Sequence, residues 1–284
     1  MARQLFELDR HKPQLMAVLN VTPDSFSDGG SYYEAGRLSV GKCCERVEAM
    51  LAAGASIIDV GGESTRPGAA NVSLMEEMDR VLPVLEAIQH TEAVISVDSS
   101  SPELLTEAAR LGMGLINDIR ALQRPGALAA AAATGLPVCL MHMQGEPDTM
   151  QQKPQYLSVL DEVKAFFHER IGACEVAGIA RQQILLDPGF GFGKTVQHNA
   201  QLLQQLAEFS EFQLPLLVGM SRKSMIPALL GERAVDQRMP ASLALAVMAV
   251  ERGAWIVRAH DIRETADAIN TVAAVKAAAS EGNG

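Results

Sequence analysis

The chain has 284 residues, of which 48% are hydrophobic and 20% charged, with a formal net charge of −10 and a pI near 5.1. This balance is typical of a globular protein and excludes a nucleic-acid binder that depends on a basic surface. No apolar run approaches the length of about 20 residues needed to span a membrane, and the polar N-terminus lacks the apolar core of a signal peptide. We therefore expect a cytoplasmic protein with neither nucleic-acid nor membrane partners.

Cysteine spacing supports the same compartment. Cys43, Cys44, Cys139 and Cys174 form no CxxC pair and no Cys/His ligand set. Buried, reduced thiols are the usual state of such cysteines in a cytosolic protein. We expect neither a disulfide nor a zinc site.

Short apolar runs rich in β-branched residues alternate with longer runs of helical periodicity, as in βα units around a parallel sheet. The eight predicted strands cover Leu15–Asn20, Ser56–Val60, Val94–Asp98, Leu115–Asp118, Pro137–His142, Ile184–Asp187, Pro215–Gly219 and Trp255–Arg258. The clearest helices cover Gly41–Ala53, Leu74–Gln89, Glu103–Leu111, Val159–Ala177 and Ala241–Arg252. Glycines that indicate helix ends are Gly54, Gly112, Gly178 and Gly253.

Eight strand–helix alternations within about 260 residues predict an α/β protein with a closed (β/α)8 TIM barrel. No linker or low-complexity segment divides the chain. We therefore expect one domain over residues 1–284, with frayed ends at about 1–12 and 280–284.

Each predicted strand ends in a polar residue that is followed by a loop. These residues are Asn20, Asp59, Asp98, Asn117, His142, Asp187, Ser221 with Lys223, and Arg258 with His260. Simple capping of buried strands would explain one or two such positions but not eight. Because the carboxyl ends of barrel strands face the same side, we expect one shared site at that mouth.

Two long polar loops follow the first two strands. The loop from Asn20 to Gly30 carries Phe26, which is suited to cover an aromatic substrate if the loop acts as a lid. The loop from Asp59 to Ala69 carries Arg66, whose five donors suit a phosphate or a carboxylate. A plain surface turn and a solvated arginine are the alternatives.

Asp98, Asn117 and Asp187 end three of the predicted strands. Their acceptors and amide suit a heterocycle that presents several N–H donors. Three oxygen groups would also suit magnesium, and Asp98 could instead cap the following helix.

Cationic residues gather after the last two strands, in GMSRKS and RAHD: Arg222, Lys223, Arg258 and His260. Phosphate sites in these barrels often lie at this place, so an anionic substrate or leaving group is expected. The segment GFGFGKT is not a P-loop, because that motif needs glycine where the chain has Pro188. Its glycines would instead let Phe192 approach a ligand.

Eight segments, found in order at the predicted strand ends, carry a family resemblance: LNVTPDSFSDGG, IIDVGGESTRPGA, ISVDS, INDIRAL, LMHMQG, LLDPGFGFGK, LLVGMSRKS and VRAHD. Together they resemble the bacterial dihydropteroate synthases, from Met16 to the last helix. The resemblance implies a transferase that condenses 6-hydroxymethyl-7,8-dihydropterin pyrophosphate with p-aminobenzoate, uses Mg²⁺ and forms a homodimer. A methyltransferase of the same barrel class would have no use for the cationic cluster, and a silent folate-binding barrel would lose the charged loop residues.

The resemblance also implies residue roles. Asn20 would bind the magnesium ion, and the residues implied in catalysis are Asp98, Asp187, Lys223, Arg258 and His260. The pterin pyrophosphate would contact Thr65, Arg66, Asp98, Asn117, Asp187, Lys223, Arg258 and His260. The p-aminobenzoate pocket, which sulfonamide drugs imitate, would include Phe26, Ser64, Thr65, Pro67, Phe192 and Ser224. The chain departs from the family at Ser101, where a basic residue is frequent.

Overall fold

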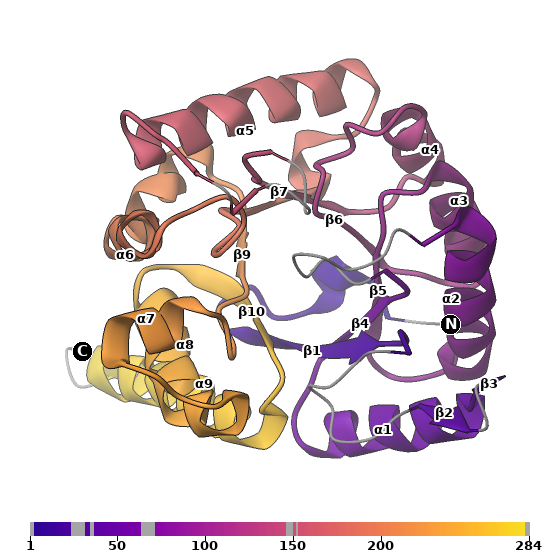
Figure 1. The fold of residues 1–284 in the computed structure, drawn as a ribbon, viewed down its shortest axis with the longest axis horizontal. Coiled ribbons are helices and arrows are strands. Elements are labelled where there is room, and N and C mark those ends of the chain that lie inside the picture. The colour runs from indigo at the N-terminus through magenta and orange to yellow at the C-terminus, as the bar shows by residue number, and fades with distance from the viewer. Residues whose placement is uncertain are drawn as a thin grey trace.

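The computed structural model describes residues 3–23, 32–34, 37–63, 72–145, 150–151 and 153–281. Eight parallel strands close into a barrel in the spatial order β1-β10-β9-β8-β7-β6-β5-β4, with helices around the outside (Figure 1). The strands are β1 (Gln14–Asn20), β4 (Ile57–Gly61), β5 (Val94–Asp98), β6 (Leu115–Asp118), β7 (Val138–Met141), β8 (Ile184–Asp187), β9 (Leu216–Val218) and β10 (Ala254–Ala259). The predicted barrel is confirmed, and each predicted strand end lies within one residue of the observed one.

Helices form the outer layer of the barrel. They are α1 (Val40–Ala52), α2 (Leu74–Ile88), α3 (Pro102–Arg110), α4 (Ala127–Thr134), α5 (Val159–Val176), α6 (Val196–Gln204), α7 (Met225–Leu230), α8 (Met239–Glu251) and α9 (Ile262–Glu281). Two short strands, β2 (Tyr33–Glu34) and β3 (Arg37–Leu38), form an antiparallel pair outside the barrel. Among the helices in the described ranges, none combines the length and apolar composition that a membrane span requires.

Local sequence signals set the helix boundaries. Ser73 starts α2 with a reciprocal capping box, in which its Oγ accepts from the backbone N–H of Glu76 at 3.3 Å. Glu76 Oε2 in turn accepts from the backbone N–H of Ser73 at 2.9 Å. The glycines predicted to end helices all adopt a left-handed backbone, with φ of 105°, 87°, 95° and 97° at Gly54, Gly112, Gly178 and Gly253.

Apolar side chains fill the part of the barrel interior that is nearer the amino ends of the strands. Successive residues of a strand point to opposite faces, so every second residue contributes to this filling. Each strand contributes one such residue, Met16, Ile57, Val94, Leu115, Cys139, Leu185, Leu217 or Ile256, and Trp255 of β10 also belongs to the cluster. A second, larger cluster fills the layer between the barrel and the helices. The barrel is therefore a packed core and not a pore.

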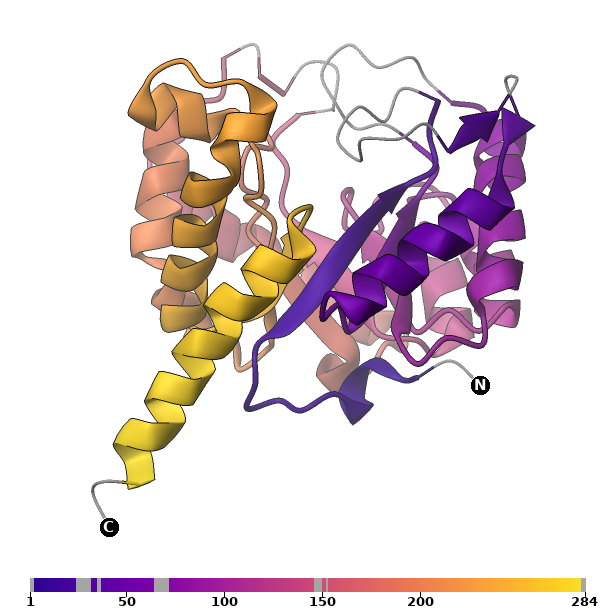
Figure 2. The same cartoon turned by 90° about the horizontal axis from the view of Figure 1, so that it is seen from below.

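The N-terminal segment closes the amino end of the barrel. Leu5 and Leu8 are 0% and 4% exposed and belong to the interior cluster, together with Trp255. The ring of Phe6 stacks on Trp255, and Trp255 Nε1 donates to the carbonyl of Asp9 at 3.1 Å. Figure 2 shows both termini on the side opposite to the carboxyl ends of the strands. Within the segment 1–12 that was expected to be frayed, Leu5 and Leu8 are therefore core residues, whereas residues 9–12 are exposed.

Candidate active site

The polar residues of the site form a layer directly above the apolar filling of the barrel. A step of two residues along a strand returns to the same face, so the residue two positions beyond each filling residue also points inward. The filling residues and their polar successors are Ile57 and Asp59, Leu115 and Asn117, Leu185 and Asp187, and Ile256 and Arg258. The site is thus built on rigid strands near the mouth, as the sequence predicted.

Arg258 joins carboxylates from two neighbouring strands. Its Nε donates to Asp59 Oδ2 at 2.7 Å, and its Nη2 donates to Asp98 Oδ2 at 3.1 Å. Asn117 Nδ2 also donates to Asp59 Oδ2, at 3.1 Å. The side chains of Arg258, Asp98 and Asp59 are 23%, 16% and 0% exposed. The structure therefore brings four of the predicted strand-end residues into one hydrogen-bonded group.

Asp59 is more central to this group than the sequence indicated. The sequence identifies it as a strand-end residue without indicating a specific role. Its Oδ1 is buried without a hydrogen-bond partner in the part of the chain that the structure describes. A buried carboxylate oxygen left unsatisfied is costly, so a ligand N–H at this atom would be favourable. Counting two residues on from Ile57 would have identified it.

Asp98 sits at the end of β5 in a strongly perturbed environment. Burial and the neighbouring charge of Asp59 raise its pKa to about 7, whereas the Arg258 guanidinium opposes the rise. Near neutral pH this carboxyl group therefore changes its charge. A titratable group of this kind in a shared cleft is a functional-site candidate.

On the opposite wall, Asp187 and Lys223 face the glycine-rich loop that follows β8. Asp187 Oδ1 accepts from the backbone N–H of Gly189 at 2.8 Å, and burial raises the pKa of its carboxyl group. Lys223 Nζ donates to the carbonyl of Phe190 and lies 4.6 Å from the ring centroid of Phe192, a cation–π distance. Burial lowers the pKa of Lys223 to about 8, and the charge of Asp187 works against this shift.

Lys194, which was not predicted as a site residue, lies buried beneath the same loop and binds its backbone carbonyl groups. It is 3% exposed, and its Nζ lies 2.9 Å from the Gly189 carbonyl oxygen and 3.0 Å from that of Phe192. It also lies 2.9 Å from His142 Nδ1. Burial and the charge of Lys194 lower the pKa of His142 to about 2, so this imidazole is neutral. Gly189 has φ of 69°, and a Cβ there would collide with the His142 carbonyl oxygen.

The expected cluster of cations after the last two strands is divided in the structure. Arg222 Nε donates to Asp261 Oδ2 at 3.1 Å, and the two side chains form an ion pair. Its charge is therefore already balanced, while Arg258 lies on the barrel carboxylates. His260 Nδ1 lies 3.1 Å from Ser221 Oγ, which also accepts from the His260 backbone N–H at 3.2 Å. Arg222, Arg258 and His260 thus have different hydrogen-bond partners and do not form one cluster.

Asn20 ends β1 at the same mouth. Gly61 has no side chain, and a Cβ there would lie 3.4 Å from Asn20 Oδ1 and 3.5 Å from Asp98 Cβ. Within residues 3–23, 32–34, 37–63, 72–145, 150–151 and 153–281, no group of three or more His, Cys, Asp or Glu side chains is arranged to hold a metal. Magnesium in enzymes often takes one or two protein oxygens and completes its shell with substrate phosphates and water. Asn20 Oδ1 is an oxygen of the kind that could serve as one such protein ligand.

Four residues of the predicted p-aminobenzoate pocket lie outside the described residues: Phe26, Ser64, Thr65 and Pro67. Arg66, predicted with Thr65 to contact the pterin pyrophosphate, lies outside them as well. Two others are described. Phe192 lies against Lys223, and Ser224 is exposed at the start of α7. Both are therefore placed beside the Asp187 wall.

Comparison with known proteins agrees with this geometry. Residues 16–260 match the pterin binding enzyme family. The chain is 57% identical to dihydropteroate synthase of Escherichia coli strain K12, over 95% of this chain and 94% of that protein. It is 53% identical to the Haemophilus influenzae enzyme, over 92% of this chain and 93% of that protein.

Two solved structures extend the similarity to the whole fold. The Yersinia pestis dihydropteroate synthase with a sulfonamide drug complex has a TM-score of 0.90 at 53% identity and covers 95% of this chain and 96% of that chain. The Xanthomonas albilineans enzyme with 4-aminobenzoic acid has a TM-score of 0.87 at 43% identity, with 95% of each chain covered. The chain therefore belongs to the pterin-binding enzymes and, among them, to the dihydropteroate synthases.

Proposed function

We propose that the polar layer inside the barrel is where this dihydropteroate synthase binds and activates its pterin substrate. The reaction joins 6-hydroxymethyl-7,8-dihydropterin pyrophosphate to p-aminobenzoate and releases pyrophosphate. One observation carries the assignment: Asp59, Asp98 and Asp187 bring three largely buried carboxylates to one mouth, and an oxygen of Asp59 lacks a partner in the described part of the chain. An aminopterin edge presents several N–H donors, which such acceptors would satisfy.

In this proposal the pterin lies between the two walls. Asp59, Asp98 and Asn117 read one part of its edge, and Asp187 with Lys223 reads the other. The carboxylates also stabilise the positive charge that grows on the pterin as the bond to the pyrophosphate oxygen breaks. Preorganised charge in a site with little water has a larger effect than the same charge in solvent.

The leaving pyrophosphate would lie toward Arg258 and His260. The guanidinium spans Asp59 and Asp98 and therefore belongs to the same polar layer as the carboxylates proposed to bind the pterin. Bound magnesium would neutralise charge on the departing pyrophosphate, with Asn20 as its protein ligand. In this proposal these groups supply the main catalytic effect, which is stabilisation of the charge on the leaving group. The amine of p-aminobenzoate needs no activation, because it is neutral and nucleophilic at pH 7.

For the second substrate, we propose a pocket at the rim beside Lys223. Phe192 supplies an aromatic face there, and Ser224 follows Lys223 directly. The Xanthomonas albilineans relative was solved with 4-aminobenzoic acid, which supports this substrate class. We propose that Phe26, Ser64, Thr65 and Pro67 complete the pocket, and that Thr65 and Arg66 contact the pterin pyrophosphate.

The direct test of this function is the p-aminobenzoate dependence of pyrophosphate release. Purified protein is given the pterin pyrophosphate and Mg²⁺, with and without p-aminobenzoate. We expect release only when both substrates are present, with dihydropteroate formed in equal amount. Tight pterin binding without turnover would instead favour the methyltransferase or silent-binder alternatives.

The perturbed side chains predict a bell-shaped pH dependence of kcat/KM for the pterin substrate. Asp98 must be ionised to stabilise positive charge, and its pKa of about 7 gives the acidic limb. Lys223 must be protonated to donate, and its pKa of about 8 gives the alkaline limb. We expect an optimum between these values, and in Lys223→Arg the alkaline limb should disappear. A flat profile across both values would contradict the assignment.

We further propose that residues 1–284 form one cytoplasmic domain that assembles as a homodimer. The four free cysteines, Cys43, Cys44, Cys139 and Cys174, are compatible with a reducing compartment. Exposed apolar side chains for a subunit interface occur at Leu229, Leu230 and Val235, with 47%, 53% and 47% exposure. Trp255 is buried against the N-terminal segment and serves the core. Sedimentation velocity gives the mass in solution.

A further inference from the structure

The turn that follows β6 has an unusual backbone. Ala121 and Leu122 are consecutive non-glycine residues with φ of 50° and 60°, a conformation that L-residues rarely adopt. Asp118 holds the turn, because its Oδ1 and Oδ2 each accept from a backbone N–H, those of Arg120 and Leu122, at 2.8 Å. Arg170 Nε donates to the carbonyl of Ala121 at 3.0 Å. Backbone strain that is fixed by several neighbours is often found beside functional sites.

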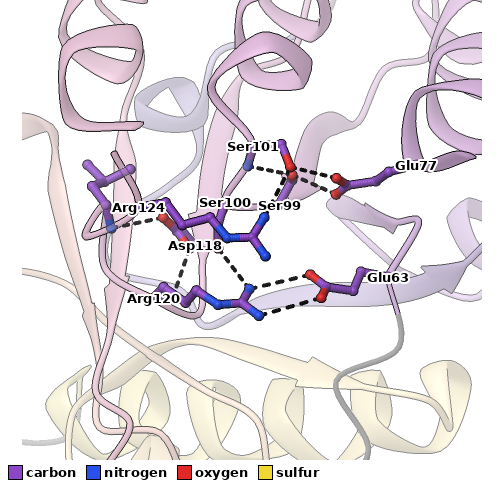
Figure 3. A network of polar contacts seen from close by, with 9 residues as sticks. Glu63, Glu77, Ser99, Ser100, Ser101, Asp118, Arg120 and Arg124 are labelled. Atoms are coloured by element: carbon purple, nitrogen blue, oxygen red, sulfur yellow. Dashed lines mark hydrogen bonds and ion pairs between the residues drawn. The ribbon is translucent and has the colours of Figure 1, made fainter. Parts of the chain in front are cut away.

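This turn directs Arg120 toward Ser100 and Glu63, which follow the neighbouring strands β5 and β4 (Figure 3). Its Nη1 lies 3.3 Å from Glu63 Oε2, and its Nη2 lies 3.5 Å from Glu63 Oε1. Nη1 also donates to Ser100 Oγ at 3.2 Å, and Ser100 Oγ donates to Asp118 Oδ1. The side chains of Arg120 and Glu63 are 12% and 16% exposed. The pair therefore differs from a solvated surface ion pair, which contributes little.

The network lies just beyond the residues of the pterin wall. In the barrel, Gly61 of β4 is in register with Asp98 of β5, and Asp98 with Asn117 of β6. Glu63 lies two residues after Gly61, and Ser100 lies two residues after Asp98. Asp118 directly follows Asn117. One guanidinium thus links the ends of all three strands that carry Asp59, Asp98 and Asn117.

The loop after β5 has a second anchor. Glu77 of α2 is 4% exposed, and its two carboxylate oxygens accept from Ser99 Oγ and Ser101 Oγ, each at 2.7 Å. The segment that directly follows Asp98 is therefore held from the helix side as well. Because this anchor does not involve Arg120, the loop should stay folded when Arg120 is replaced.

We propose that Arg120, through Glu63 and Ser100, is a positioning residue that sets the spacing of the ends of β4, β5 and β6. The inference rests on the proposed function, since it assigns Arg120 the task of placing the pterin-reading carboxylates. A displacement of about 1 Å at a reacting centre can cost two orders of magnitude in rate. Arg120 therefore acts through Asp59 and Asp98 without touching the substrate.

The test compares Arg120→Met, Arg120→Lys, Glu63→Gln and the Arg120→Met/Glu63→Gln double variant with Arg124→Met as a matched control. Arg124 lies in the same loop, and its contact to Ser101 Oγ is longer, at 3.4 Å. We measure kcat and both KM values per folded enzyme, with the folded fraction determined by circular dichroism. Wild-type turnover that requires p-aminobenzoate is established first, so failure of the proposed function is recognised separately.

We expect kcat to fall about tenfold or more in Arg120→Met and Glu63→Gln, with little change in the thermal midpoint. The kcat of the double variant should be no lower than that of the less active single variant, because both changes break the same interaction. Arg120→Lys should recover part of the loss, since it keeps the charge but not the fork. If Arg120→Met does not fold, Glu63→Gln decides the matter. A kcat for the folded variants like that of Arg124→Met, or additive losses in the double variant, would overturn the proposal.

Discussion

Replacing Arg258 with methionine is expected to lower the free energy of unfolding by about 3 kcal/mol near pH 8 and to remove nearly all turnover. The guanidinium bonds Asp59 Oδ2 at 2.7 Å and Asp98 Oδ2 at 3.1 Å, and the Asp59 side chain is 0% exposed. Methionine has similar length but no charge, so both carboxylates would lose their shared partner. Removing one member of a buried ion pair is far more costly than removing a surface pair.

The loss of stability should depend on pH, with a sign that follows from Asp98. Its folded-state pKa, about 7, is above the ordinary value of 3.8, so the folded protein binds more protons between these values. Stability therefore falls as pH rises through this window. Without Arg258 the pKa of Asp98 rises further, which extends the fall to higher pH. We expect the deficit of Arg258→Met relative to wild type to be smaller at pH 5 than at pH 8.

Urea unfolding at both pH values measures this difference, and two further variants separate stability from catalysis. Arg110→Met removes an arginine from an exposed pair with Glu107, in which the side chains are 67% and 40% exposed, and should cost less than about 1 kcal/mol. Adding Asp59→Asn to Arg258→Met should recover stability but not turnover. A variant as stable as wild type at pH 8 would contradict the electrostatic account of the layer.

The strand pattern explains why so much of the barrel was predictable. The short apolar runs have the length of strands, and the polar residues at their ends place Asp98, Asn117 and Asp187 at one mouth of the barrel. The alternation of side chains within a strand also predicts that Asp59, two residues beyond Ile57, points into the barrel. Its role in the site was not predicted. In a barrel, local periodicity is enough to place side chains around the mouth.

Features that depend on contacts distant in the chain were not predictable in the same way. The Arg222–Asp261 ion pair joins residues that lie 39 positions apart, and the Arg120–Glu63 pair spans 57 positions. Leu5 and Leu8 looked like part of a polar terminus, because two leucines do not define a periodic face. Only the closed barrel supplies the apolar end that buries them. Lys194 gave no signal beyond its place after a glycine-rich run.

Asp187→Asn is expected to lower kcat/KM for the pterin substrate by about two to three orders of magnitude, while the fold is retained. Asparagine has nearly the same shape, and its side-chain oxygen still accepts from the Gly189 N–H that Asp187 Oδ1 holds at 2.8 Å. The loop after β8 should therefore keep its conformation. What disappears is the negative charge that, in the proposed mechanism, stabilises the positive charge growing on the pterin as pyrophosphate leaves.

Steady-state kinetics with each substrate varied in turn tests this expectation. The KM for p-aminobenzoate should change much less than kcat if, as proposed, Asp187 acts on the pterin and not on the incoming amine. Asp9→Asn, at the amino end of the barrel, is a matched control and should leave turnover unchanged, since Asp9 contacts Trp255 through its backbone carbonyl. Near-normal turnover in folded Asp187→Asn would mean that hydrogen bonding alone, without the charge, suffices at this wall. The developing positive charge would then have to be stabilised chiefly by Asp59 and Asp98, which would place the reacting carbon closer to β4 and β5 than to β8.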